Sequence, residues 1–175
     1  MPKYITRRTF LGTSGAFAWA TAQGAQSAVP GPNDRVTVGM IAVGSRGQEV
    51  LEAVKTVPGT EIVAVCDAYT GRLERAVART AGRARIFKDH RELLADKSID
   101  AVVVASPDHL HKRHVIESLE AGKDVYCEKP LTYSIEEGLE IQAAVQKSGR
   151  LLQVGSQGMS SQTQRRPRSL FKAAS

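Results

Sequence analysis

Short apolar runs alternate with helix-like segments along the chain after residue 35. The runs are rich in β-branched residues and span residues 36–43, 62–66, 85–87, 100–105, 124–127 and 151–154. Such runs are typical of strands that are buried on both faces of a parallel sheet. Their regular alternation with helices predicts an α/β fold, a doubly wound parallel sheet with helices on both faces.

The segments between these runs have the start and stop signals of helices. Ser106 is suited to be an N-cap, with Pro107 as the first helical residue. Ser134 and Glu137 have the spacing of a capping box, in a helix that we expect to end at Gly149. Helices are predicted from the turn at residues 44–47, over 71–81, around 93–94, over 106–121, over 134–149 and, as a basic segment, over 160–173.

The first apolar run ends in a glycine-rich turn. The turn is Gly44-Ser45-Arg46-Gly47, and Asp67 follows 20 residues after Gly47, at the end of the second run. Strand, glycine-rich turn, helix, strand and acid form the fingerprint of dinucleotide-binding domains, although Ala42 stands where the fingerprint has its first glycine. The alternative is an ordinary strand, turn and helix of an α/β domain.

The residue types of this turn suit a dinucleotide. Gly44 lets the backbone approach a pyrophosphate, Gly47 lets the helix pack closely against the strand, and the helix N-terminus offers N–H groups to the phosphates. A carboxylate at Asp67 accepts hydrogen bonds from ribose hydroxyls and repels a 2′-phosphate. We therefore expect NAD as the cofactor, with NADP left open by the neighbouring Arg72.

Five polar or glycine residues each follow a predicted strand. They are Gly44, Asp67, Ser106, Glu128 and Gln157. Ligands of open parallel sheets bind at the carboxyl ends of the strands. We therefore expect these five residues to face one cleft.

The charge of the chain is concentrated at its two ends. The net charge is +6, but residues 29–149 contain 16 basic and 18 acidic residues. This distribution argues against a basic folded surface for nucleic acid. Hydrophobic residues make up 42% of the chain and aromatic residues only 5%, which predicts an aliphatic core.

The N-terminal segment, residues 1–28, has the pattern of an export signal. Arg7 and Arg8 stand before a mildly apolar stretch, as in twin-arginine signals, and residues 20–22 fit a small-x-small cleavage site. The alternative is a disordered or amphipathic N-terminus. No stretch of the sequence is long and apolar enough to span a membrane. We expect export to the periplasm or outside the cell, after folding around a cytoplasmic cofactor, with residues 29–34 as a linker.

The cysteines and histidines leave two further questions. Export would permit a disulfide between Cys66 and Cys127, but the ends of apolar runs favour two separate buried thiols. His109, His111 and His114 could in principle hold a metal ion. No carboxylate or cysteine stands at ligand spacing, so we predict no metal site, with His109 and His114 on the helix surface.

Three more motifs join the fingerprint. They are residues 106–111 (Ser-Pro-Asp-His-Leu-His), residues 128–130 (Glu-Lys-Pro) and residues 155–157 (Gly-Ser-Gln). Together they resemble the Gfo/Idh/MocA family of oxidoreductases over residues 35–161. With the export signal, the chain resembles the exported bacterial branch of that family.

The resemblance implies a role for each motif. Lys129 would contact the substrate and help to position the reacting hydroxyl, as the catalytic residue. Pro130 would fix its loop. The cofactor would be bound by Gly44, Ser45, Arg46 and Gly47 at the pyrophosphate, by Asp67 at the adenosine ribose, by Ser106, Pro107 and His111 along its length, and by Glu128 at the nicotinamide ribose.

The same resemblance implies a second α/β domain, which forms one wall of the substrate site. We expect residues 35–158 to form the dinucleotide-binding domain and residues 159–175 a basic tail at the truncated start of the second domain. The expected function is hydride transfer between nicotinamide and a sugar or polyol hydroxyl, with homo-oligomers only where the second domain is present. An NAD-dependent glycoside hydrolase and a non-catalytic nucleotide-binding fragment are the alternatives.

Overall fold

A computed structural model describes residues 35–160 of the chain. The predicted export signal and linker, and residues 161–175 of the predicted basic tail, lie outside the described residues. Within the described part, no helix is both long and apolar enough to cross a membrane.

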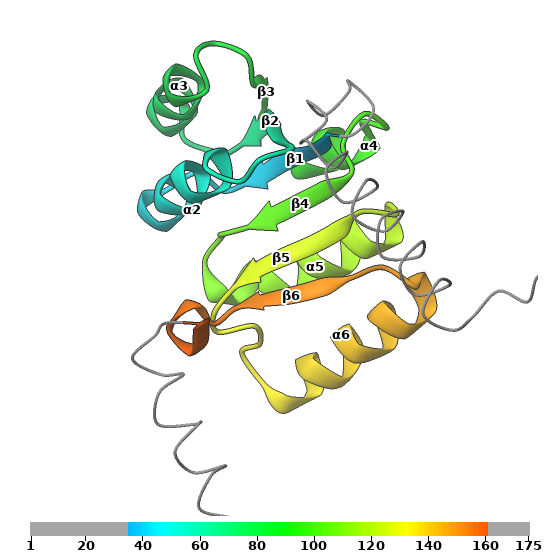
Figure 1. Cartoon of the computed structure of the whole chain (residues 1–175). Coiled ribbons are helices and arrows are strands. Elements are labelled where there is room, and N and C mark those ends of the chain that lie inside the picture. Colours follow the sequence, from blue (N-terminus) through cyan, green and yellow to red (C-terminus); the bar gives the residue numbers. More distant parts are fainter. Residues whose placement is uncertain (1–34, 161–175) are drawn as a thin grey trace, which may run out of the picture. The chain divides into compact units, whose positions relative to one another are not determined.

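Six parallel strands form one sheet (Figure 1). Their order in the sheet is β3-β2-β1-β4-β5-β6, the order of dinucleotide-binding Rossmann domains. This confirms the predicted α/β fold. The strands are β1 (Val36–Ile41), β2 (Thr60–Cys66), β3 (Arg85–Phe87), β4 (Ala101–Val104), β5 (Asp124–Glu128) and β6 (Leu152–Gly155).

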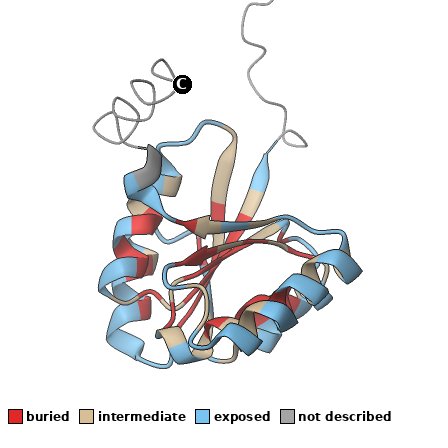
Figure 2. Cartoon of the chain, turned by 90° about the horizontal axis from the view of Figure 1, so that it is seen from below, coloured by how far each residue is buried: buried red, intermediate tan, exposed pale blue. Residues whose placement is uncertain are grey.

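Helices cover both faces of this sheet. They are α2 (Ser45–Lys55), α3 (Thr70–Arg79), α4 (His90–Ala95), α5 (His111–Glu120) and α6 (Ile135–Ser148), with short 3-10 helices η1 (Asp108–Leu110) and η2 (Gln157–Ser160). The sides of the helices that face the sheet are buried and their outer sides are exposed (Figure 2).

Alternate residues of the central strands supply two separate cores. Met40 of β1 and Val65 of β2 pack in one cluster with Leu51 of α2. Ile41 and Val104 pack in the other, which contains buried residues of α4, α5 and α6. Successive side chains of a strand point to opposite faces, so each central strand serves both cores. Among the described residues, the fully buried hydrophobic side chains are aliphatic or sulfur-containing, as the composition predicts.

Both cysteines are buried and unbonded to each other, as predicted. Burial raises the pKa of the Cys66 thiol to about 11 and that of Cys127 to about 12. Both groups are therefore neutral core thiols at neutral pH.

The helix predicted over residues 106–121 begins later than expected. Pro107 has an extended ψ of 146°, η1 follows, and α5 starts only at His111. Ser106 does not cap a helix, because its hydroxyl lies 3.0 Å from the ring nitrogen Nδ1 of His114. A tertiary contact thus replaces the local cap that the sequence favours.

The predicted capping box at the start of α6 is present in a modified form. Ser134 is the N-cap, and its hydroxyl accepts a hydrogen bond from the N–H of Glu137. The Glu137 carboxylate accepts from the N–H of Tyr133, one residue before the cap. The helix ends where Gly149 adopts a left-handed φ of 65°, as the sequence indicates.

Gly47 fixes how closely α2 approaches the turn after β1. A Cβ atom at this position would lie 2.3 Å from the carbonyl oxygen of Ala42. Backbone atoms cannot move aside as the end of a side chain can, so only glycine fits at this position. The sequence-based expectation of close packing at Gly47 is confirmed.

We predict that Gly47→Ala lowers the free energy of unfolding by about 2 kcal/mol or more, because the added methyl overlaps the backbone. Gly71→Ala is the matched control. Gly71 also lies in the first turn of a helix, and nothing lies within 4 Å of its added Cβ. This control should be neutral or stabilising by up to about 1 kcal/mol. Urea unfolding measures both, and equal effects would contradict the packing argument.

Candidate cofactor site

The carboxyl ends of β1, β2, β4 and β5 meet at one edge of the sheet, where two hollows lie. The first has a volume of about 360 Å³ and is lined by Asp67, Pro107 and residues of β1, β2 and η1. The second, of about 570 Å³, is lined by Arg46, His111, Glu128, Lys129 and Gln157. Of the five residues predicted to face one cleft, Asp67 lines the first hollow, Glu128 and Gln157 line the second, and Ser106 lines both, whereas Gly44 is among the lining residues of neither.

The turn after β1 has an open helix end. Gly44 is the N-cap of α2, no cap bond from a side chain is present, and the first turn contains no acidic residue. A Cβ at Gly44 would make only ordinary contacts, 3.6 Å or more from the Arg72 guanidinium. The fold itself therefore tolerates a side chain at Gly44. The close approach of an anion to the turn would be a reason for glycine at this position.

Ala42 takes over the conformation of the missing glycine. Its φ is 67°, in the left-handed region that favours glycine, and its N–H donates to the carbonyl of Cys66 at 2.8 Å. Ala42 thus adopts a conformation typical of glycine at the position where the fingerprint has its first glycine. The cost of this conformation for a non-glycine residue is about 1 kcal/mol.

Asp67 is bonded more extensively than the sequence indicates. The residue is only 7% exposed. Its Oδ2 accepts from the N–H of Val43 and its Oδ1 from the N–H of Tyr69, both at 2.9 Å. The guanidinium of Arg72 lies 3.8 Å from Oδ1. A carboxylate offers about four lone-pair sites, so Asp67 can hold the turn and still accept from a ligand hydroxyl.

The His111 ring lies between two loops of the site and contacts the backbone of both. Its ring is buried, with Nδ1 at 2.6 Å from the carbonyl oxygen of Pro130 and Nε2 at 2.8 Å from that of Ser106. The ring thus joins the loop after β4 to the loop after β5. The resemblance places His111 along the cofactor, and the structure adds that both ring nitrogens already face backbone oxygens.

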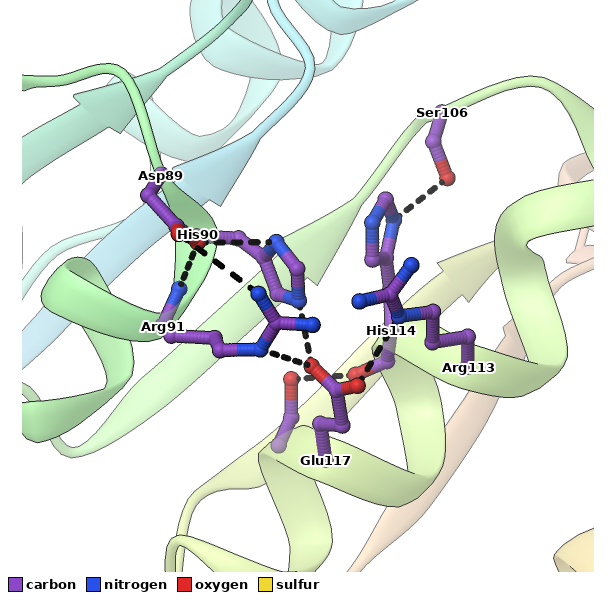
Figure 3. Close-up of polar contacts among 8 residues, drawn as sticks. Asp89, His90, Arg91, Ser106, Arg113, His114 and Glu117 are labelled. Carbon is purple, nitrogen blue, oxygen red and sulfur yellow. Dashed lines mark hydrogen bonds and ion pairs between the residues drawn. The ribbon is translucent and has the colours of Figure 1, made fainter.

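The prediction that His114 lies on the helix surface is wrong. His114 is 8% exposed, and its ring centroid lies 4.5 Å from that of His90. Figure 3 draws both side chains with the polar contacts around them. His90 in turn contacts Glu117, which also pairs with Arg113 at 2.9 Å. Burial, helped by the charge of His90, lowers the pKa of His114 to about 4, so the ring is neutral at neutral pH. His109 is exposed, as predicted.

No group of three or more His, Cys, Asp or Glu side chains in residues 35–158 has an arrangement that could hold a metal ion. Of the histidines that the sequence singles out, His111 and His114 instead make hydrogen bonds through their rings, and His114 also makes a ring contact with His90. Both His90 and His114 line the first hollow, together with Asp67. The sequence motifs gave no signal for His90, because its role depends on contacts with α5.

Glu128 lies at the centre of a polar cluster in the second hollow. Its Oε1 lies 3.1 Å from Nη2 of Arg46 and 3.3 Å from the hydroxyl of Tyr126, and it also accepts from the amide of Gln157. Burial works to raise the pKa of Glu128, but the hydrogen bonds and charge of Arg46 and the bond from Gln157 lower it overall. Glu128 is therefore an ionised acceptor at neutral pH.

Lys129 is the residue directly after Glu128 in the sequence. Its side chain is exposed and lines the second hollow, and its N–H lies 3.4 Å from Oε2 of Glu128. The peptide bond between Lys129 and Pro130 is cis. The ammonium group can therefore meet a ligand in the hollow, while its backbone is held next to Glu128.

Comparison with known proteins gives a consistent family match. The sequence pattern of the Gfo/Idh/MocA oxidoreductase family, with an NAD-binding Rossmann fold, matches residues 36–156. Inositol 2-dehydrogenase 1 of Saccharopolyspora erythraea is 44% identical over 123 residues, which are 69% of this chain and 36% of that protein. This chain spans about a third of the length of the curated relatives that it matches.

Two solved structures resemble the described fold. Scyllo-inositol dehydrogenase from Lactobacillus casei, with bound NAD(H) and scyllo-inositol, superposes with a TM-score of 0.75 at 23% identity, over 79% of this chain and 41% of that one. At this identity the likeness shows the fold alone. GenD2 from gentamicin A biosynthesis, in complex with NAD, superposes with a TM-score of 0.66 at 28% identity, over 70% of this chain and 34% of that one.

Proposed function

The chain belongs to the Gfo/Idh/MocA family of oxidoreductases, and on this premise we propose that it is the NAD-binding part of a dehydrogenase that acts on a polyol or sugar hydroxyl. The observation that supports this most directly is the pair of hollows at the carboxyl ends of the strands, with a glycine-rich turn and a buried carboxylate beside them. The inositol 2-dehydrogenase relatives support the polyol class of substrate.

The residues of the site fit a dinucleotide. In the proposal, the N–H groups of residues 44–47 bind the pyrophosphate, and Asp67 accepts from the adenosine ribose. Ser106 and Pro107 line the middle of the cofactor, with His111 behind them. Glu128 accepts from the nicotinamide ribose. When bound, NAD supplies the group that accepts the hydride.

Lys129 has the catalytic role in this proposal. Loss of a hydride from an alcohol carbon requires a neighbouring group that holds the oxygen and handles the hydroxyl proton. Lys129 is the cation of the Glu-Lys-Pro motif that lines the second hollow, next to the proposed nicotinamide-ribose acceptor. Its backbone position beside Glu128 keeps the amine near the reacting hydroxyl, which favours the reaction by orientation. The remainder of the enzyme would supply the other wall of the substrate site.

NAD is the preferred cofactor in this proposal because Asp67 places a buried negative charge where a 2′-phosphate would lie. We predict that the chain binds NAD more tightly than NADP. Asp67→Asn should lower the ratio of NAD affinity to NADP affinity at least tenfold. The amide oxygen of Asn can still accept from a backbone N–H, so the turn is disturbed less than by a smaller residue. Isothermal calorimetry with both cofactors measures the affinities.

Asp100→Asn is the matched control. Asp100 likewise accepts from a backbone N–H, that of Thr37 of β1 at 2.8 Å, but Thr37 lies at the opposite end of β1 from the turn that Asp67 holds. This variant should leave the ratio of NAD to NADP affinities unchanged. Tighter binding of NADP by the wild-type chain, or an unchanged ratio in Asp67→Asn, would reject the assignment of Asp67.

We also propose that the chain is exported through the twin-arginine route. The pair Arg7-Arg8 before a mildly apolar stretch supports this, and so does the cofactor site, because a protein loaded with a cytoplasmic nucleotide must be exported in the folded state. Periplasmic or extracellular localisation follows from the proposal.

Replacing both Arg7 and Arg8 by Lys should therefore retain the protein in the cytoplasm with its signal uncleaved. This change keeps both positive charges and replaces only the two guanidinium groups by ammonium groups. Lys3→Gln, which removes a charge outside the pair, should leave export intact. Cell fractionation and the mass of the product measure the outcome, and normal export of the double variant would disprove the signal.

A further inference from the structure

The side chain of Arg46 extends from the turn into the second hollow. Arg46 is the second residue of α2, and its guanidinium is 3.1 Å from the carboxylate of Glu128, 82 positions further along the chain. The other end of the guanidinium contacts Glu49 on the same helix. Arg46 lines the second hollow and is not among the residues that line the first. Its side chain therefore faces the Glu128 side of the site.

Oε1 of Glu128 is surrounded by donors from three different elements. Arg46 of α2, Tyr126 of β5 and Gln157 of η2 all approach this one oxygen. Oε2 receives only the longer contact from the N–H of Lys129, at 3.4 Å. Because each carboxylate oxygen accepts through two lone pairs, Oε1 is saturated and Oε2 is the acceptor left for a ligand hydroxyl.

The cluster is closely packed. A Cβ at Gly155 would lie 2.5 Å from the hydroxyl of Tyr126 and 2.9 Å from the amide nitrogen of Gln157. The absence of a side chain at Gly155 thus allows these two donors to reach Glu128. A carboxylate held by donors from three elements has one fixed orientation, which favours recognition of a ligand at a fixed place.

The ion pair also keeps Glu128 charged. The Glu128 side chain is 5% exposed, whereas the Arg46 side chain is 43% exposed. A carboxylate this deeply buried requires a partner, and within residues 35–158 Arg46 forms the one ion pair that Glu128 makes. Tyr126, Asp108, His111 and Lys129 are the other titratable groups around this hollow.

We propose that Arg46 is a positioning residue for the nicotinamide end of the cofactor. Through its ion pair it orients Glu128 so that one carboxylate oxygen accepts from the nicotinamide ribose. The Arg46 side chain does not bind the pyrophosphate, although its backbone belongs to the pyrophosphate turn. This inference rests on the proposed NAD-binding function. The place of Arg46 in the turn implies that its guanidinium acts at the pyrophosphate, whereas the inference assigns it to the nicotinamide end.

Calorimetry with NAD and ADP tests the assignment. ADP has the adenosine and both phosphates but lacks the nicotinamide ribose. Arg46→Met should lower the affinity for NAD about tenfold, in line with loss of a charge-assisted contact, and leave that for ADP within about twofold. Arg46→Lys, which keeps the charge, should restore part of the NAD affinity.

Arg35→Met is the matched control. Arg35 forms an ion pair with Glu61 at 3.1 Å, the same distance as between Arg46 and Glu128, and the Arg35 side chain is 47% exposed against 43% for Arg46. This variant should bind both ligands as the wild-type chain does. Thermal unfolding checks that all variants are folded. If Arg46→Met does not fold, Glu128→Gln tests the same ion pair from the carboxylate side.

A double-variant cycle completes the test. If Arg46 acts through Glu128, the combined variant should lose no more NAD affinity than Glu128→Gln alone. Equal loss of ADP and NAD affinity in Arg46→Met, or additive losses in the cycle, would overturn the inference and leave the proposed function intact. Failure of the wild-type chain to bind NAD would instead overturn the proposed function, and the inference with it.

Discussion

The buried carboxylate of Asp67 connects the ends of the two strands around which the site is arranged. It accepts hydrogen bonds from the N–H groups of Val43, after β1, and Tyr69, after β2. A charge this deeply buried is stable only when such bonds satisfy it. The turn that it holds determines where α2 begins, and the first turn of α2 places Arg46 opposite Glu128. The two halves of the candidate site therefore depend on one carboxylate.

The fold could be predicted from the sequence because its determinants are local. The short run at residues 85–87 is a strand with the predicted bounds, and Ser134 caps α6 as its spacing indicates. Apolar runs of strand length that alternate with helices leave few arrangements other than a parallel sheet. The family could be identified for a similar reason, since its motifs stand directly after predicted strands.

The parts that could not be predicted depend on contacts between side chains of different elements. Ser106 has every local feature of an N-cap, yet its hydroxyl contacts His114 instead. The buried ring of His114 packs against His90, which belongs to another helix. The pairing of Arg46 with Glu128 joins residues 82 positions apart. No local pattern reports such pairs, and these are the contacts that give the two hollows their shape and charge.

The central claim is that NAD binds across the carboxyl ends of the strands, and amide chemical shifts of the chain during an NAD titration test it most directly. The claim predicts shifts at residues 44–47, Ser106 and Glu128. Amides near Leu94 and Glu120, which line a separate groove between α4 and α5, should not move. Shifts centred on that groove, with residues 44–47 unchanged, would contradict the account.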